Sequence, residues 1–187
     1  RTRCVGSRSE SGEPQARALV SALEALGHQA VYTKEPTHGV WGEAIRRSSV
    51  AGRMPVEQEL HAFMEDRKEH VRDVINPALE RGDAVVVDRY FVSSAAYQGA
   101  RGIDPEKILR ENEDFAPIPD VVFLLVVPAA TGMERVQRRG EANLFERVGY
   151  LDAVAAVFAG IDRPYVRRID GTEPQASITR IICDEVL

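Results

Sequence analysis

The sequence predicts an α/β fold in which helices cover both faces of one parallel β-sheet. Two observations lead to this prediction. Short apolar runs of strand length alternate along the chain with longer segments in which apolar residues recur at helical spacing. The strand-like runs at 84–87 and 121–127 are rich in valine and stop abruptly at an aspartate or a proline, as buried parallel strands do where they reach a ligand crevice.

The composition limits the class of protein. Its 187 residues, 44% of them hydrophobic, suffice for one domain with a sizeable core. The formal net charge of −5 argues against a nucleic-acid-binding surface but is compatible with a basic pocket for a small anion. We expect no membrane association, because no apolar run approaches the ~20 residues of a membrane helix. We expect a cytoplasmic protein, because Cys4 and Cys183 form neither a disulfide framework nor a zinc pattern.

In the first half of the chain we expect a β-α-β unit followed by two further helices. The first strand should lie before Gly6, and Pro14 and Gly27 suit the start and the end of the helix that follows. The second strand ends at the charged residues Lys34 and Glu35. The expected ranges are a helix over 15–26, a strand over 30–33, a helix over 41–50, a break over 52–55 and a long helix over 56–81.

The second half continues this alternation. Ser93 and Ser94 are suited to cap a helix that carries Tyr97, and Asp104 with Pro105 is a typical start of another helix. The short polar stretch over 141–143 leads into Phe145-Glu146-Arg147, an arginine-bearing segment that could be a lid over an anion or simply a solvated loop. We expect strands over 84–87, 121–127 and 165–169, and helices over 104–115, 130–139, 151–160 and 174–187.

The central candidate site is the pair Asp88-Arg89, which follows the valine-rich run at 84–87. An arginine fork can bind two phosphate oxygens, and an aspartate can orient that arginine or a metal-bound water. The pair therefore predicts a phosphate site at the carboxyl edge of the sheet. The alternative is a structural ion pair that only fixes a loop, since such pairs are common.

A second candidate site lies on the long helix over 56–81. Phe63, Arg67 and His70 are spaced by four and three residues, which places them on one side of the helix. They could line a pocket for a nucleobase. Alternatively, Phe63 is ordinary core and Arg67 pairs with a neighbouring acid. The other charges are expected to form a solvated face, and they include Glu57, Glu59, Asp66 and Glu69.

Three segments form a combined motif. They are Thr33-Lys34-Glu35-Pro36, the run from Phe63 to His70, and Asp88-Arg89-Tyr90 continuing to Ser94-Ala95-Ala96-Tyr97-Gln98-Gly99. Together they resemble the thymidylate kinase family, and the resemblance extends from about Gln15 to near the C-terminus. It implies a three-layer P-loop kinase fold in a single domain, residues 1–187, with a small lid at about 138–147. It also implies an enzyme that phosphorylates dTMP to dTDP with ATP and Mg²⁺.

The resemblance implies a role for each matched residue. Arg89 would hold the dTMP phosphate, with Asp88 beside it near the magnesium ion. Phe63 would stack on thymine and Arg67 would bond its exocyclic oxygen. The remaining dTMP-binding positions are Glu35 and Pro36 bordering the cleft, Ser94, Tyr97 against C2′ of the sugar, and Gln98.

The resemblance also concerns the lid and the oligomeric state. Arg138 and Arg139 would belong to the lid and close on the ATP phosphates, which makes them catalytic candidates beside Asp88 and Arg89. The family is commonly dimeric, and the helix over 56–81 offers a face for a homodimer. No dedicated cluster of metal-ligating side chains is predicted, so Mg²⁺ would arrive with ATP.

The opening segment departs from the family's pattern, which is an apolar strand followed by G-x-x-x-x-G-K-[ST]. Anchored on Gln15-Ala16, the lysine position is Gly12 and the magnesium-binding hydroxyl position is Glu13. Glutamates near a triphosphate would repel it, although serine and glycine amides could still form a weaker anion site. The degenerate phosphate loop, where ATP would bind, comprises Gly6, Ser7, Arg8, Ser9, Glu10, Ser11, Gly12 and Glu13.

This departure leaves three hypotheses. The first is an active kinase for dTMP, with an opening segment that does not represent the natural chain, for example through a shifted reading frame. The second is a catalytically impaired protein that binds dTMP or another nucleotide, because the phosphate loop is truly degenerate. The third keeps the fold with a different acceptor, against which Tyr97 and Arg67 argue.

Overall fold

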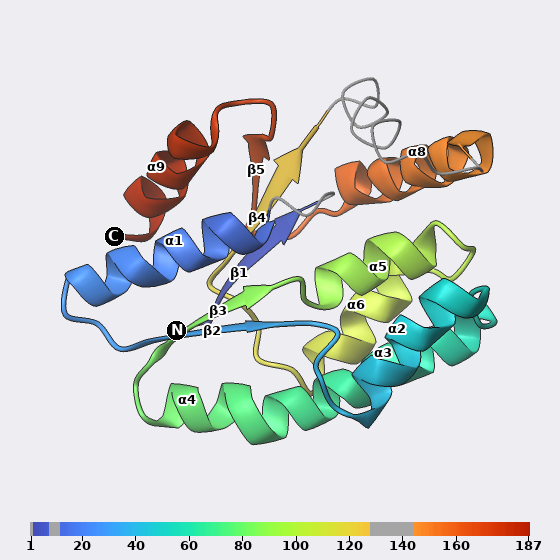
Figure 1. Ribbon diagram of the computed structural model, residues 1–187, viewed down its shortest axis with the longest axis horizontal. Helices are drawn as coiled ribbons and strands as arrows, with labels where there is room; N and C mark the ends of the chain where they lie inside the picture. The colour runs from blue at the N-terminus through green and yellow to red at the C-terminus, as the bar shows by residue number, and fades with distance from the viewer. Residues whose placement is uncertain (1, 8–11, 128–143) are drawn as a thin grey trace.

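The computed structural model describes residues 2–7, 12–127 and 144–187 and confirms the α/β prediction (Figure 1). A 5-stranded parallel sheet has the strand order β2-β3-β1-β4-β5. Its strands are β1 (Thr2–Ser7), β2 (Ala30–Lys34), β3 (Ala84–Asp88), β4 (Val121–Val126) and β5 (Val166–Asp170). The described helices are α1 (Gly12–Ala25), α2 (Val40–Ala51), α3 (Val56–His70), α4 (Asn76–Glu80), α5 (Phe91–Gly99), α6 (Pro105–Glu113), α8 (Leu144–Gly160) and α9 (Gln175–Val186).

Alternating strand residues build a separate core on each face of the sheet. On β3, Val86 packs toward α1 and α9 on one face of the sheet. Val85 and Val87 pack toward the helices on the other face, which include α5, α6 and α8. On β4, Phe123 joins Val86, and Leu124 joins the other core. Successive residues of a strand point to opposite faces of the sheet, and here both faces are buried. The strands therefore appear in the sequence as continuous hydrophobic runs. Each fully buried side chain of this kind contributes roughly 1.5–3 kcal/mol, so the two cores hold the three layers together.

The strand β1 lies in the centre of the sheet, where we expected a strand before Gly6. It pairs with β3 from Thr2 opposite Val85 and with β4 as far as Ser7 opposite Leu125. The polar opening residues make a poor central strand by composition, but backbone pairing on both sides does not depend on side-chain type. Gly6 and Ser7 therefore form the end of strand β1.

The long predicted helix is continuous from α3 to α4 but contains one π-helical turn, η1 (Val71–Ile75). Within it, the N–H of Asn76 donates to the carbonyl of Val71, five residues earlier. Pro77 has no N–H for a regular helical bond, and its ring would crowd the Asp73 carbonyl. The wider turn accommodates the proline without ending the helix.

Two sequence predictions about helix starts are wrong. Ser93 and Ser94 do not cap α5, which begins at Phe91 after the extended residue Tyr90 and has no side-chain cap. Helix α8 begins at Leu144 rather than at 151, because glutamate and arginine are good helix formers and extend it. Residues 144–147 of the predicted lid are therefore helical. The remaining lid residues, 138–143, and the predicted helix over 130–139 lie outside the described residues.

None of the helices in the described part of the chain combines the length and apolar character needed to span a bilayer.

Polar contacts hold one edge of the sheet against α6. Arg163, in the segment before β5, pairs with Glu113 at 2.9 Å and with Glu106 at 3.0 Å. The hydroxyl of Tyr165 donates to Glu113 at 2.8 Å. These bonds fasten α6 to β5.

Because the contact between α6 and the segment before β5 depends on the Glu113 carboxylate, its contribution to stability depends on pH. Burial alone would raise its pKa, but the hydrogen bonds from Arg163 and Tyr165 outweigh burial and lower the pKa of Glu113. A lowered pKa means that the stabilisation is present above the unfolded pKa of about 4.3 and is lost as the pH falls through the folded value. We expect Glu113→Gln to lower the free energy of unfolding at pH 7 by about 1 kcal/mol, since the site is partly solvated.

Urea denaturation between pH 7 and pH 3 measures this effect. The gap between the variant and the unaltered protein should shrink as the pH falls. Glu111→Gln is the matched control, because Glu111 lies on the same helix in an exposed pair with Lys107 at 3.8 Å. A gap for Glu113→Gln that is constant across this pH range would contradict the expectation.

Candidate active site

The carboxyl ends of β2 and β3 lie side by side and bring two predicted segments together. Lys34 is paired with Asp88 in the parallel register, and the N–H of Glu35 donates to the Asp88 carbonyl at 3.1 Å. The Glu35-Pro36 peptide bond, which follows directly, is cis. The segments that carry Glu35 and Arg89 therefore start from one edge of the sheet, as the sequence predicts.

Arg89 has an unusual backbone conformation. Its φ of 65° lies in the left-handed region, which non-glycine residues rarely adopt. Such strain of roughly 1–3 kcal/mol persists where the surroundings impose it and is concentrated at functional sites. The Arg89 guanidinium carbon lies 5.5 Å from the centre of the Tyr97 ring. The strained turn thus directs the arginine toward α5.

Asp88 is half-buried at the end of β3. Its pKa is raised chiefly by burial; the neighbouring charges of Arg89 and Lys34 oppose this shift, and the carboxylate of Glu13 adds to it. The charge of Arg89 thus lowers the pKa of Asp88 but does not outweigh the effect of burial. The negative charge of Glu13 makes this corner of the site less favourable to anions than the arginine alone would.

Arg67 is the centre of a buried polar network. Its side chain is 1% exposed, and that of its ion-pair partner Glu35 is 2% exposed. The Nε of Arg67 donates to Glu35 at 2.9 Å, Nη1 donates to Asn112 at 2.6 Å, and Nη2 donates to Ser94 at 3.1 Å. Because Asn112 belongs to α6 and Ser94 to α5, the guanidinium joins α3 to the end of β2 and to two further helices.

His70 completes the network at its other end. One ring nitrogen lies 3.0 Å from Oε1 of Glu35, and the other lies 2.7 Å from the Thr33 hydroxyl. Arg67 thus pairs with an acid, as one of our two interpretations had it, but this acid is 32 residues away in the sequence. Phe63 is half-buried and belongs to neither core cluster, so the ring of Phe63 is not ordinary core.

The loop after β2 is held by Asp66, which we expected on a solvated face, and by Arg46. The carboxylate of Asp66 accepts from the N–H of Thr37 at 2.9 Å and from its hydroxyl at 2.6 Å. Arg46 donates to the carbonyl of Pro36 at 2.8 Å. A Cβ on Gly42 would lie 1.9 Å from the Thr37 carbonyl oxygen, so only glycine lets α2 approach this closely. The loop that carries Glu35 is therefore rigidly supported from α2 and α3.

A second buried acid was also missed. We expected Glu59 on a solvated face, yet Glu59 is 4% exposed. It accepts from Gln98 at 3.2 Å and from Arg53 at 3.1 and 3.2 Å, and it pairs with Arg101. Asp66 is another exception, since it is fully buried. Alternating charges along a helix predict a solvated face, and partners that lie far along the chain leave no local signal.

Two predicted phosphate-loop positions lie in α1. Gly12 is buried in the first turn of that helix. Glu13 pairs with Arg17 at 2.9 Å and with Lys34 at 3.4 Å, and its pKa is lowered chiefly by the hydrogen bond from Arg17. Arg8 to Ser11, Arg138 and Arg139 lie outside the described residues. Lys34 is a cation at the end of β2 next to these positions, and its charge is neutralised in part by Glu13.

Side chains with distinct chemical functions therefore lie at the carboxyl edge of the sheet and on the helices beside it. Arg89 supplies a charge for an anion, Phe63 and Tyr97 supply rings, and the Arg67 network supplies a fixed donor. Among the described residues no cluster of three or more histidine, cysteine, aspartate or glutamate side chains could hold a metal ion. Asp88 is a single oxygen donor of the kind that Mg²⁺ prefers, and it fits an ion that is bound mainly by phosphate and water.

A parallel sheet covered by helices, with charged side chains at the carboxyl ends of its strands, is typical of nucleotide-binding enzymes of the P-loop kinase class, in which ligands bind at that edge. The sequence profile of the thymidylate kinase family matches residues 13–176. This chain belongs to the thymidylate kinase family, and it is thus an enzyme of the phosphotransferase class.

Individual relatives agree with the family profile. A thymidylate kinase of Akkermansia muciniphila is 49% identical over 148 residues, which are 79% of this chain and 72% of the relative. Thymidylate kinases of Xanthomonas euvesicatoria pv. vesicatoria and Xanthomonas oryzae pv. oryzae are each 43% identical over 166 residues, which are 88% of this chain and 73% of each relative. The residues before Glu13 fall outside the family match.

The buried pair of Arg67 and Glu35 should be essential for stability. Glu35→Gln keeps the side-chain size but leaves Arg67 as a buried cation without its counter-charge. Breaking such a pair costs about 3 kcal/mol or more, so we expect the free energy of unfolding in urea to fall by that amount. Glu65→Gln is the control, since Glu65 pairs with Lys68 near the surface and should contribute less than about 1 kcal/mol. Equally small losses for both variants would show that the buried pair is not essential.

Proposed function

We propose that this chain transfers a phosphoryl group from ATP to dTMP and so produces dTDP for dTTP synthesis. Membership of the thymidylate kinase family supports this reaction. The observation that carries it is the strained backbone of Arg89 at the carboxyl end of β3, with the guanidinium beside Tyr97. A cation held in a costly conformation at a ligand edge fits the binding of the acceptor phosphate.

The thymine base would lie between Phe63 and Arg67. Phe63 is half-buried outside both core clusters, and its ring can stack on the base. Arg67 has only donors, and its Nη1 uses one N–H for Asn112. The second N–H of Nη1 would donate to the exocyclic oxygen of thymine. A cytosine amino group, which is itself a donor, would be rejected at this position.

The sugar would contact α5 and the loop after β2. We propose that Tyr97 lies against C2′ and disfavours a 2′-hydroxyl, while Ser94 and Gln98 help to hold the nucleotide. Glu35 and Pro36 border the same cleft. Glu35 is fully engaged by Arg67 and His70, so its contribution is to fix the position of Arg67.

The donor side would use Asp88, Mg²⁺ and the lid arginines. Asp88 would act on the magnesium ion that arrives with ATP, and that ion would neutralise charge on the phosphates when bound. Arg138 and Arg139 would close on the ATP phosphates. Phosphoryl transfer requires alignment and charge neutralisation more than covalent chemistry, which is why a site lined by arginines and closed to water suits it.

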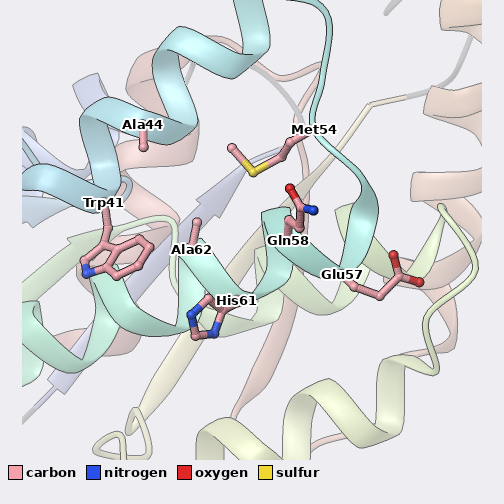
Figure 2. Close-up of a pocket in the computed structure, with 7 residues that line it drawn as sticks. All are labelled: Trp41, Ala44, Met54, Glu57, Gln58, His61 and Ala62. Atoms are coloured by element: carbon pink, nitrogen blue, oxygen red, sulfur yellow. The ribbon is translucent and has the colours of Figure 1, made fainter.

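The surroundings of the enzyme are part of the same proposal. We propose a cytoplasmic protein, which the free thiol of Cys183 supports, since reduced cysteines are the rule in that compartment. We also propose a homodimer formed through α2 and α3. A cavity of about 450 Å³ opens between these helices and is lined mainly by apolar side chains (Figure 2). Val40, at the start of α2, is 78% exposed.

A coupled assay of ADP release from MgATP tests the proposed reaction. We expect release only when dTMP is present, and faster release when residues 9–14 are replaced by a standard phosphate loop, because this restores the missing lysine and hydroxyl. Arg89→Lys should raise the KM for dTMP about ten-fold or more, since lysine lacks the two-pronged donor geometry.

The matched control is Arg81→Lys, because Arg81 pairs with Asp83 at the opposite end of β3 and should leave the KM unchanged. Activity of the loop-replaced chain alone would mean that the chain as given is the impaired nucleotide-binding protein. If neither chain shows ADP release that depends on dTMP, the proposed reaction is wrong.

The proposed homodimer has its own test. Light scattering after size exclusion should give twice the 20.7 kDa of one chain. Ala44→Glu places a charge in the cavity between α2 and α3 and should yield the monomer. Ile118→Glu is the control, since Ile118 is a 58% exposed apolar residue elsewhere, and should stay dimeric. A monomeric unaltered chain would exclude the homodimer.

A further inference from the structure

Tyr150 connects three segments of the chain, which are its own helix α8, helix α5 and the segment between α2 and α3. Its hydroxyl donates to the backbone carbonyl of Tyr97 at 3.0 Å. The centres of these two rings lie 6.4 Å apart at an angle of 55°. On its other side, the guanidinium carbon of Arg53 lies 4.9 Å from the centre of the Tyr150 ring. One side chain therefore joins α8 to α5 and to the segment between α2 and α3.

The carbonyl that Tyr150 binds needs an external donor. It belongs to the last turn of α5, where carbonyl groups lose their partners in the helix. The N–H of Arg101, which lies four residues after Tyr97, donates instead to the Gln98 carbonyl at 3.0 Å. Burial raises the pKa of Tyr150, so its hydroxyl keeps its proton at neutral pH and remains a donor. Helix α8 thus completes the C-terminal end of α5.

The ring of Tyr97 is positioned by the same helix. Phe158, two turns after Tyr150 on α8, meets this ring edge-on at 6.2 Å and 89°. Arg89 lies on the ring at 5.5 Å. Aromatic pairs at these distances have preferred orientations. Helix α8 therefore determines where the Tyr97 ring lies relative to Arg89.

Tyr150 is also linked to α5 by a second route, through Arg53 and Glu59. Arg53, which lies on the Tyr150 ring, also donates to Glu59 at 3.1 and 3.2 Å. Glu59 accepts in turn from Gln98 at 3.2 Å. Because Tyr97 and Gln98 are adjacent in the sequence, both are fixed from outside their own helix, one by Tyr150 and the other by Glu59.

We propose that Tyr150 is a positioning residue that sets the selectivity of the acceptor site for a deoxyribose. This inference rests on the proposed function, in which Tyr97 lies against C2′ of the sugar. Tyr150 does not touch the nucleotide. It holds the Tyr97 backbone and ring in place, so that a 2′-hydroxyl is excluded while the deoxy sugar fits.

The test measures binding rather than turnover, so it does not depend on the phosphate loop. Isothermal titration calorimetry gives the Kd for dTMP and for ribothymidine 5′-monophosphate, which differs from dTMP only by the 2′-hydroxyl. Tyr150→Phe removes one hydroxyl and keeps the ring. Tyr165→Phe is the matched control, because the Tyr165 hydroxyl also donates one hydrogen bond, to Glu113 at 2.8 Å, away from the acceptor side.

We expect Tyr150→Phe to loosen the Tyr97 ring, so that the ribonucleotide binds up to about five-fold more tightly relative to dTMP, a limit set by the free energy of the one lost hydrogen bond. The ratio of the Kd for ribothymidine 5′-monophosphate to the Kd for dTMP should therefore fall. Tyr165→Phe should leave this ratio unchanged even if it lowers the Tm equally. Arg53→Gln, at a side chain that is 37% exposed, should lower the ratio less, and it provides a second test if Tyr150→Phe does not fold.

Three outcomes would overturn the inference. An unchanged ratio in both Tyr150→Phe and Arg53→Gln would show that Tyr150 has only a structural role. An equal change in Tyr165→Phe would show that general loss of stability is the cause. If the unaltered chain does not bind dTMP at all, the proposed acceptor site is wrong, and the inference falls with it.

Discussion

The ion pair between Arg67 and Glu35 is the interaction on which the acceptor side of this protein depends. Both side chains are almost completely buried, and a buried charge is tolerated only when it is paired and hydrogen-bonded. The network around the pair includes Ser94, Asn112 and His70. The residues come from separate elements, so satisfying one guanidinium fixes the end of β2 against α3, α5 and α6. The geometry of the proposed acceptor site is thus a consequence of buried polar groups that require hydrogen-bond partners.

The same constraint applies to α5, whose position matters most for the nucleotide. Its first turn provides the hydroxyl of Ser94, which Arg67 binds, and its last turn provides the carbonyl of Tyr97, which Tyr150 binds. The next residue, Gln98, donates to the buried Glu59. A short helix would not hold its side chains accurately by itself. Polar contacts from α3 and α8 give α5 the rigidity that the proposed site for a small, flexible sugar phosphate requires.

Much of this could be predicted from the sequence. The valine-rich runs predicted the parallel sheet, and the position of Asp88-Arg89 after such a run predicted charged groups at its carboxyl edge. The buried acids could not be predicted. Glu59 and Asp66 lie on a helix whose alternating charges are typical of a solvated face, and their partners lie far away in the sequence. The start of α5 was missed for a related reason, since Ser94 bonds a distant arginine rather than its own backbone.

The central claim is that dTMP binds at the carboxyl edge of β2 and β3, beside Arg89. A crystal structure of the protein with dTMP tests this claim most directly. The prediction is a nucleotide with its phosphate on Arg89, its base against Phe63 and its sugar beside Tyr97. Density for dTMP elsewhere, for example in the cavity between α2 and α3, would contradict it, as would an edge that stays empty at saturating dTMP.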